Sequence, residues 1–404
     1  ITIPESVTRI RDRAFYGCSS LTTITIPESV TYIGYQAFGG CSSLTSITIP
    51  ASVTSIGEVA FADCSSLTSI TIPESETSIG RSTFYNCKSL KSVIIPNSVT
   101  SIGRGAFADC SSLTAVTIPN SVKSIGGSAF FGCKSLTSIT ILAGVTSIGE
   151  GAFSGCLSLT DITIPESVTS IGGSAFSGCK SLKSVTINSN DIANSYKLNS
   201  IFGEQVTEYI IGNSVKSIGK QAFRFCPSLS SIVVEGGNTA FDSRENCNAI
   251  IETATNTLIA GCRNTIIPNG VTSIGVGAFS GCSSLTDITI PESVTSIGTH
   301  AFRDCSSLKS VTIPASVTSI GEQAFAGCKS LKSVTINSDK VANRANLKEL
   351  FGSQVTEYIL GNSVTSIGEQ AFYYCESLTD ITIPGGVTSI GYEAFRGCLS
   401  LTSI

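Results

Sequence analysis

Residues 44–66 read Leu-Thr-Ser-Ile-Thr-Ile-Pro-Ala-Ser-Val-Thr-Ser-Ile-Gly-Glu-Val-Ala-Phe-Ala-Asp-Cys-Ser-Ser, and this stretch decides the fold. We number its positions 1 to 23 from the Leu. At positions 4 to 6, Ile47 and Ile49 alternate with Thr48, which is the period of a half-buried β-strand. Pro50 at position 7 ends that strand, because proline has no amide hydrogen to donate.

The second half of the stretch returns to the core twice. Val53 and Ile56, at positions 10 and 13, predict a second short extended segment with both side chains inward. Gly57 at position 14 fits a turn that needs a positive φ or a close backbone approach. Ala60 and Phe61, at positions 17 and 18, then re-enter the core through a short helical or turn-like segment.

The stretch recurs along the chain with a period of 23 residues. Its Phe recurs as Phe15, Phe38, Phe61, Phe84, Phe107, Phe130, Phe153 and Phe176. One turn cannot bury its inward side chains alone, whereas turns stacked about 4.8 Å apart bury them against their neighbours. We therefore predict one right-handed solenoid of about 17 turns over residues 1–404, with parallel β ladders, a stacked Phe column and turn-like convex segments.

Three segments break the period. The irregular turns 182–205 and 331–354 share the motif Phe-Gly-x-Gln-Val-Thr-Glu-Tyr-Ile at and just beyond their ends, which indicates an old duplication. The third is an insertion at 236–263. Its segments 248–251 and 257–260 flank a short polar stretch and predict a β-hairpin that protrudes from the solenoid.

Composition narrows the class of protein. With 41% hydrophobic and 13% charged residues, the chain can bury a large core. A net charge of -4 with no Lys/Arg cluster argues against nucleic acid as a partner. No apolar run reaches the roughly 20 residues of a membrane span. The chain begins at Ile1 and stops at Ile404, each inside a repeat, so we expect a fragment of a longer polypeptide.

The turns resemble the BspA-like class of leucine-rich repeats, whose pattern is L-x-x-I-x-I-P-x-x-V-x-x-I-G-x-x-A-F-x-x-C-x-x. The match covers essentially the whole chain; Arg11 replaces the expected Gly and Glu76 the inward Val. The resemblance implies a leucine-rich-repeat solenoid. It also implies an extracellular or cell-surface location, because members are typically surface proteins of host-associated bacteria and some parasitic protists. Several are implicated in adhesion to host matrix proteins or to other cells.

Fourteen of the 16 Cys fall at position 21. Stacked neighbours would have Cα atoms about 4.8 Å apart, within the disulfide range, but their Cβ vectors would be parallel. We therefore expect buried free thiols; a disulfide ladder and metal binding are the alternatives. No Cys-x-x-Cys occurs and no His lies beside the column, so no metal site and no cofactor are predicted.

Cys247 and Cys262 lie outside that column, placed symmetrically about the turn of the predicted hairpin. They are a candidate disulfide across its strands. The alternative is that Cys262 is buried at the Leu position of its turn, with Cys247 nearby.

Catalysis is not expected. His300 is the sole His and falls at the variable position 16, so it is predicted to be a solvated surface residue. Paired carboxylates such as Asp161 with Glu166 have nothing around them that would exclude water, and the glycines form neither G-x-G-x-x-G nor a P-loop.

Outward residues supply the candidate binding surface. A Thr column follows position 5, interrupted by Ile94, and variation among turns concentrates at positions 2, 3, 15 and 16. Strand propensity with solubility explains the Thr as well as ligand binding does, and an ice-binding Thr array is a further alternative. The candidate ligand contacts are Thr25, Thr48, Thr71, Thr117, Thr140, Thr163, Tyr32, Tyr35, Asp161 and Lys183.

These observations favour a non-catalytic, cell-surface or secreted adhesion scaffold that binds host or neighbouring-cell proteins or glycans through its strand face. The alternative is a structural stalk or a self-associating, fibre-forming surface protein. An enzyme is the remaining alternative.

Overall fold

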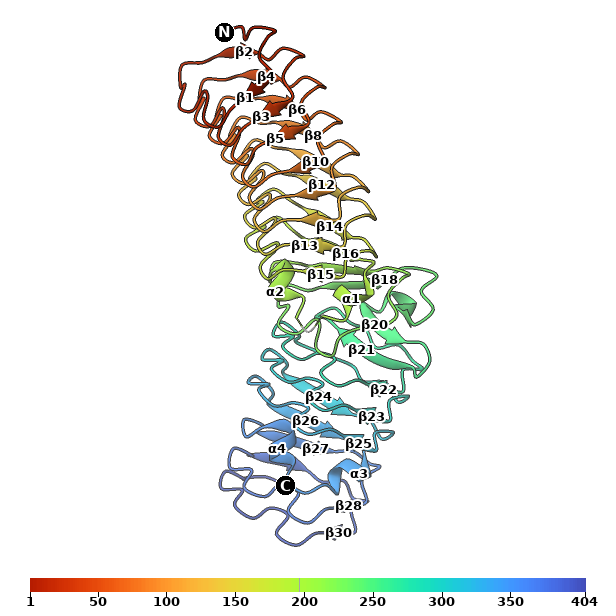
Figure 1. The fold of residues 1–404 in the computed structure, drawn as a ribbon. Helices are drawn as coiled ribbons and strands as arrows, with labels where there is room; N and C mark the ends of the chain where they lie inside the picture. Colours follow the sequence, from red (N-terminus) through yellow and green to blue (C-terminus); the bar gives the residue numbers. More distant parts are fainter. Residues whose placement is uncertain (196) are drawn as a thin grey trace. The chain divides into compact units, whose positions relative to one another are not determined.

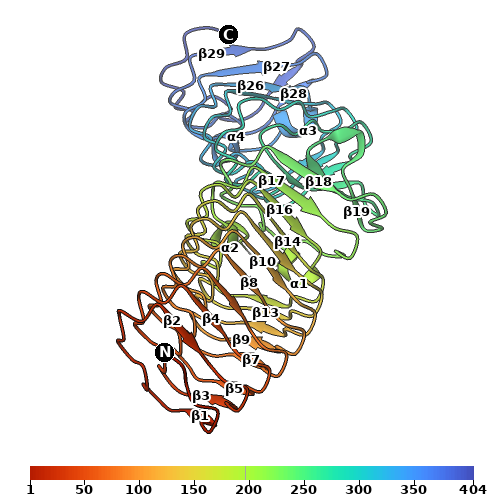
Figure 2. The same cartoon turned by 90° about the horizontal axis from the view of Figure 1, so that it is seen from above.

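The computed structural model describes residues 1–195 and 197–404; Tyr196, within the first irregular turn, lies outside the described residues. Unit 1 comprises Ile1–Ala193 and Ser200–Val206, and unit 2 comprises Asn194–Asn199 and Thr207–Ile404. Both units are β-solenoids, and they hold about 17 turns in all, as the period predicts. Figures 1 and 2 show the parallel strands of each unit stacked turn upon turn.

Unit 1 carries two parallel β ladders in which like positions of successive turns pair, as Ile24 pairs with Ile47. The first ladder, at positions 3 to 6, is one sheet of β2 (Thr23–Thr25), β4 (Ser46–Thr48), β6 (Ser69–Thr71), β8 (Ser92–Ile94), β10 (Ala115–Ile118) and β12 (Ser138–Ile141), and it resumes in a further sheet with β14 (Asp161–Ile164) and β16 (Ser184–Ile187). The second, at positions 12 and 13, contains β1 (Arg9–Ile10), β3 (Tyr32–Ile33), β5 (Ser55–Ile56), β7 (Ser78–Ile79), β9 (Ser101–Ile102), β11 (Ser124–Ile125), β13 (Ser147–Ile148) and β15 (Ser170–Ile171).

A third row of hydrogen bonds joins the turns where positions 15 to 20 lie, which we call the turn side. The amides of Gln36 and Phe38 donate to the carbonyl oxygens of Glu58 and Ala60 in the next turn, at 3.1 and 2.8 Å. Positions 16 and 20 have positive φ, as Val59 shows with 62°. The segment is therefore a run of tight turns. Its alternate amides donate hydrogen bonds to the next turn of the solenoid, so its backbone polar groups are paired without a helix or strand.

Gly57 serves a close backbone approach and does not have a positive φ. A Cβ on Gly57 would lie 2.5 Å from the carbonyl carbon of Gly34 and 2.6 Å from the nitrogen of Tyr35. A side chain at Gly57 would thus collide with the backbone of the preceding turn, and the same holds at Gly103, Gly126 and Gly149. Positive φ occurs at positions 16 and 20 instead, and position 20 is often occupied by Gly, Asp or Asn, as by Asp63 at 62°.

The position-18 Phe rings stack along the core of unit 1. Ring centroids of consecutive residues from Phe15 to Phe176 lie 5.1 to 5.7 Å apart. The position-21 thiols accompany this column, since the Sγ of Cys64 donates to the carbonyl oxygen of Phe38 at 3.2 Å and the other turns repeat the bond. Burial and register together make each turn the packing surface of the next.

Unit 2 has the same plan. Its first ladder is formed in two separate sheets, one with β17 (Glu208–Ile211) and β18 (Ser231–Val234), the other with β24 (Ser310–Ile313), β26 (Ser333–Ile336), β27 (Glu357–Leu360) and β29 (Asp380–Thr382). Its second contains β20 (Ala249–Glu252), β21 (Thr257–Gly261), β22 (Ser273–Ile274), β23 (Ser296–Ile297), β25 (Ser319–Ile320), β28 (Ser366–Ile367) and β30 (Ser389–Ile390). Before β20 come β19 (Phe241–Asp242) and the 3₁₀ turn Arg244–Asn246.

The hairpin predicted to protrude is instead part of the second ladder of unit 2. β20 and β21 are antiparallel, but β21 also pairs in parallel with β22, where Leu258 lies opposite Ile274. Ile250, Ile251 and Leu258 are each 0% exposed. The predicted hairpin is confirmed, but its protrusion is not, because consecutive residues Ile250 and Ile251 need burial on both faces of the strand, which a protruding hairpin cannot supply.

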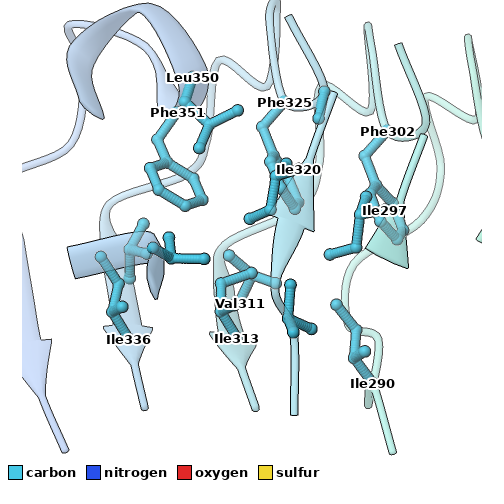
Figure 3. Close-up of a cluster of buried hydrophobic side chains, with 14 of the residues drawn as sticks. Ile290, Ile297, Phe302, Val311, Ile313, Ile320, Phe325, Ile336, Leu350 and Phe351 are labelled. Carbon is cyan, nitrogen blue, oxygen red and sulfur yellow. The ribbon is translucent and has the colours of Figure 1, made fainter. Parts of the chain in front are cut away.

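Each irregular turn carries two short helices, the first packed beside second-ladder strands and the second at the position-18 Phe column. They are α1 (Asn190–Ala193) and α2 (Asn199–Phe202) in the first turn, and α3 (Asp339–Ala342) and α4 (Leu347–Phe351) in the second. In unit 2, Phe351 of α4 continues the ring column, 5.2 Å from Phe325, as Figure 3 shows beside Phe302. Phe202 of α2 and Phe351 of α4 thus keep the Phe column continuous through the longer turns.

Replacing Phe107 by Ala should lower the free energy of unfolding by about 3–5 kcal/mol, because the ring is fully buried between Phe84 and Phe130 and its loss leaves a cavity. Urea unfolding of the full chain measures the loss. A loss below about 1 kcal/mol would contradict the packing described here.

Candidate binding surfaces

The predicted Thr column lies in register on the outer face of the first ladder of unit 1. Thr25 pairs with Thr48, and Thr117 pairs with Thr140, so their side chains project from neighbouring strands at the same level. All six candidates, Thr25, Thr48, Thr71, Thr117, Thr140 and Thr163, are exposed. Ile94 occupies the same column and is 74% exposed, so an apolar side chain interrupts the hydroxyl array.

Other Thr positions have a structural role. At position 2 the hydroxyl of Thr68 donates to the carbonyl oxygen of Thr45 at 3.2 Å, and at position 11 that of Thr169 donates to Thr146 at 3.2 Å. No such bond is found for the position-5 hydroxyls of unit 1 among the described residues. The position-5 column is therefore the part of the Thr set that the inter-turn bonding does not use.

Two charged candidates are engaged locally. The hydroxyl of Thr160 donates to a carboxylate oxygen of Asp161 at 2.7 Å. The Nζ of Lys183 donates to the carbonyl oxygen of Gln205 at 3.4 Å, and the equivalent residue of the second irregular turn, Lys332, makes the same kind of bond. Lys183 therefore helps to hold its irregular turn in place, which the sequence did not indicate.

The candidate Tyr side chains lie beside arginines near the start of unit 1. The Arg9 guanidinium lies 4.3 Å from the ring centroid of Tyr32, and that of Arg13 lies 5.6 Å from the ring centroid of Tyr35. Tyr32 belongs to the second ladder and Tyr35 to the turn side, so they do not share a face with the Thr column. The candidates thus fall on three sides of unit 1 and do not form one site.

A further surface, in unit 2, was missed by the sequence analysis. A groove of about 630 Å³ follows the Ser-Ile-Gly residues of the second ladder from β22 to β25. Ile259 and Val276 line it together with Lys220. The groove is lined by the same Ser-Ile-Gly repeat that other turns carry, so no sequence motif distinguishes it. Only Val276, at a position that varies between turns, could have indicated it in the sequence.

All 16 cysteines are free thiols, and those of the position-21 column are buried except Cys18, which is exposed, and Cys398, which is half-buried. Burial raises the pKa of Cys87 and of Cys133 to about 12, although each thiol also donates to a backbone carbonyl. Burial therefore favours the inert, protonated form of these two thiols.

Cys247 and Cys262 are not joined in the structure. Glu252 pairs with Thr257, which is the symmetric register that the disulfide requires, but a bulge between Ile250 and Ile251 shifts the pairing beyond it by one residue. The Cys262 thiol donates instead to the carbonyl oxygen of Asn248 at 3.3 Å, and Cys262 is fully buried. This arrangement matches the alternative, in which Cys262 takes the Leu position.

His300 lies in a polar cluster on the turn side of unit 2. Its Nε2 is 3.1 Å from the amide oxygen of Gln323 and 3.4 Å from Nη1 of Arg303. No group of three or more His, Cys, Asp or Glu residues able to hold a metal occurs in the described part of the chain. Within those same residues, no helix is long and apolar enough to span a membrane.

Glu76, at the inward position where other turns have Val, is 5% exposed. Burial raises the pKa of its carboxyl group, although the amides of Ile56, Thr77 and Ser78 donate to it at 2.8, 3.2 and 3.3 Å. The second ladder of unit 1 is interrupted at this turn, between β5 and β7. The buried carboxylate of Glu76 thus takes the place of an apolar Val side chain and accepts the hydrogen bond of Ile56 where the ladder is interrupted.

The family model described as "BspA type Leucine rich repeat region (6 copies)" matches residues 1–114, 100–230, 199–258, 255–346 and 348–404. The chain belongs to the BspA-type leucine-rich repeat family. This confirms the resemblance drawn from the turn pattern. Leucine-rich-repeat proteins of this kind are generally scaffolds without catalytic activity.

Solved structures similar to this BspA-type chain include two bacterial leucine-rich repeat proteins. A leucine-rich repeat protein from Bacteroides ovatus is 30% identical, with 92% of this chain and 81% of that chain covered and a TM-score of 0.48. A leucine-rich cell surface protein from Faecalibacterium prausnitzii is 30% identical, with 100% and 86% covered and a TM-score of 0.37. No curated protein matches the BspA-type chain.

A thiol reagent added without reductant should label Cys18 first in the native protein, because the other column thiols are buried or half-buried. After denaturation it should label all 16 cysteines, counted by intact-protein mass spectrometry. Two or more blocked thiols would contradict the free column or the separation of Cys247 from Cys262.

Replacing Glu76 by Val should stabilise the protein by about 1–3 kcal/mol at pH 7, because it removes a buried carboxylate. The folded-state pKa of Glu76 is raised, so its contribution to stability falls as pH rises from the unfolded value, about 4.3, through the folded value. The advantage of Glu76→Val should therefore grow with pH in urea unfolding, while the exposed control Glu74→Gln should show no such trend. A pH-independent difference for Glu76→Val would refute the assignment.

Proposed function

We propose that this protein is a non-catalytic adhesion scaffold at the cell surface or in the extracellular space, which binds host or neighbouring-cell proteins or glycans through the Thr column of unit 1. The observation that supports it is the exposure of in-register position-5 hydroxyls that the inter-turn bonding does not use. Hydroxyls at positions 2 and 11 bond to the neighbouring turn, whereas those of the column are available to a ligand.

The geometry also explains how such a surface would act. Substituting an exposed polar residue alters stability by only about 0.5 kcal/mol, so outward residues can vary while the Phe and Ile core stays fixed. Contacts repeated on successive turns engage one ligand together, and affinity rises with the number of turns engaged. The protein then needs no deep pocket, because a long flat sheet offers many weak contacts.

A structural stalk or fibre is the second candidate. The exposed Ile94, within an otherwise polar column, is the observation that favours it, since an apolar side chain on a flat sheet face promotes self-association. Size-exclusion chromatography with light scattering tests this alternative. Loss of an oligomer on Ile94→Thr substitution would support it, and a monomer in both proteins would exclude it.

Replacing Thr48, Thr117 and Thr140 together by Lys should weaken binding to immobilised extracellular-matrix proteins at least tenfold, because three long charged side chains then cover the column. Biolayer interferometry measures the affinity, and pull-down with mass spectrometry identifies the bound proteins.

The matched control places Lys at Ala51, Asn120 and Ala143, which are exposed on the same three turns but follow the strand. The control should bind as the wild type does. Equal loss in both variants would point to nonspecific charge effects, and unchanged binding of the Thr variant would refute the strand-face site.

A further inference from the structure

Exposed aromatic side chains gather at position 19 on the turn side of unit 1. Tyr16 is 56% exposed, Tyr85 39% and Phe131 44%. The other turns of the unit carry small residues at this position: Gly39, Ala62, Ala108, Ser154 and Ser177. Phe131 has no polar atom, so solubility does not account for its exposure, and exposed apolar groups that recur on one face mark interaction sites.

Small residues occupy position 19 in the turns next to each ring. A Cβ on Gly39 would lie 3.2 Å from Cδ2 of Tyr16, so that ring extends beside the next turn and the glycine leaves room for it. Ala62 and Ala108, in the turns on either side of Tyr85, are 2% and 4% exposed. Each ring therefore has a small residue at position 19 of the adjacent turns, as Phe131 has in Ala108 and Ser154.

The spacing of two of the rings is set by the core beneath them. Position 19 directly follows the core Phe, and the centroids of Phe84 and Phe107, and of Phe107 and Phe130, lie 5.2 Å apart. Tyr85 and Phe131 are two turns apart, hence roughly 10 Å. That is close to one disaccharide repeat of a β-1,4-linked glycan, in which alternate sugars present the same face. Tyr16 lies three turns from Tyr85 and is out of step with this repeat.

Planar polar groups border the rings at position 20. The Nδ2 of Asn86 donates to a carboxylate oxygen of Asp63 at 2.7 Å, across neighbouring turns, and Asp109 occupies the same position one turn later. Carboxylates and amides next to an exposed ring are the groups that pair with sugar hydroxyls while the ring covers the apolar sugar face.

We propose that the turn side of unit 1 binds a linear β-1,4-linked glycan, with alternate sugars stacked on Tyr85 and Phe131 and their hydroxyls bonded to Asp63, Asn86 and Asp109. This inference rests on the proposed binding role of the protein, but it places a glycan on a different side from the Thr column.

The test measures binding of three hexasaccharides to the full chain by isothermal titration calorimetry. Cellohexaose and chitohexaose carry the β-1,4 linkage, and comparing them distinguishes a glucan from an amino-sugar polymer as the source. Maltohexaose, with its α-1,4 linkage and curved chain, should not bind. Replacing Tyr85 or Phe131 by Ala should weaken binding about tenfold, as loss of an aromatic anchor does. Tyr16→Ala, out of step with the repeat, should leave the affinity unchanged.

A gain of binding gives a second readout that loss of folding cannot imitate. Ser177 lies two turns beyond Phe131 and Ser154 lies one turn beyond it. Ser177→Tyr should extend the platform by one repeat and tighten hexasaccharide binding, whereas Ser154→Tyr should not. Failure of both β-linked oligosaccharides to bind, or equal effects of the two Ser variants, would overturn the inference. Capture of matrix proteins by that same chain would leave the proposed function standing.

Discussion

The stacking of identical positions from turn to turn is the constraint on which the rest of this structure depends. The position-18 rings lie 5.2 Å apart from Phe84 to Phe107, and every backbone row must keep the same step. A side chain that enters the core therefore meets a copy of itself above and below, so its size is fixed by its neighbours. Gly57 shows how tight this is, since a single Cβ would lie 2.5 Å from the backbone of the preceding turn.

The first ladder could be predicted because Ile47-Thr48-Ile49 alternates with a period of two, and the second because Val53 and Ile56 mark a further extended segment. For the turn side only a short helical or turn-like segment could be predicted, because its detailed conformation is not set by the residues that adopt it. Position 16 has a positive φ whether it holds Val59, Ser82 or Gly105, and a β-branched residue does not choose that region by itself. The inter-turn hydrogen bonds impose it, so the stacking outweighs local preference.

The hairpin itself was predicted correctly, but its protrusion from the solenoid was not, for a related reason. The spacing of apolar residues along the chain does not show whether an apolar strand protrudes or joins a ladder. The position of β21 follows from its parallel pairing with β22. The bulge beside Ile250 then keeps Cys247 and Cys262 from pairing, because one extra residue moves Cys262 away from the position opposite Cys247. The family pattern marks Cys and Leu positions but gives no information on such a shift.

The binding surfaces were harder to predict than the fold, because turn-to-turn stacking fixes the inward residues but leaves the outward residues free to vary. Inward positions repeat because each must fill the same space, whereas outward positions contact solvent and vary at little cost. The Thr column repeats even so, because β-branched residues suit strands, and its regularity alone does not separate binding from propensity. Position 19 has no such explanation: a tight turn does not require Phe131, and small residues serve in the adjacent turns. An outward residue that departs from its column without a structural reason is therefore a better indicator of a ligand than one that follows it.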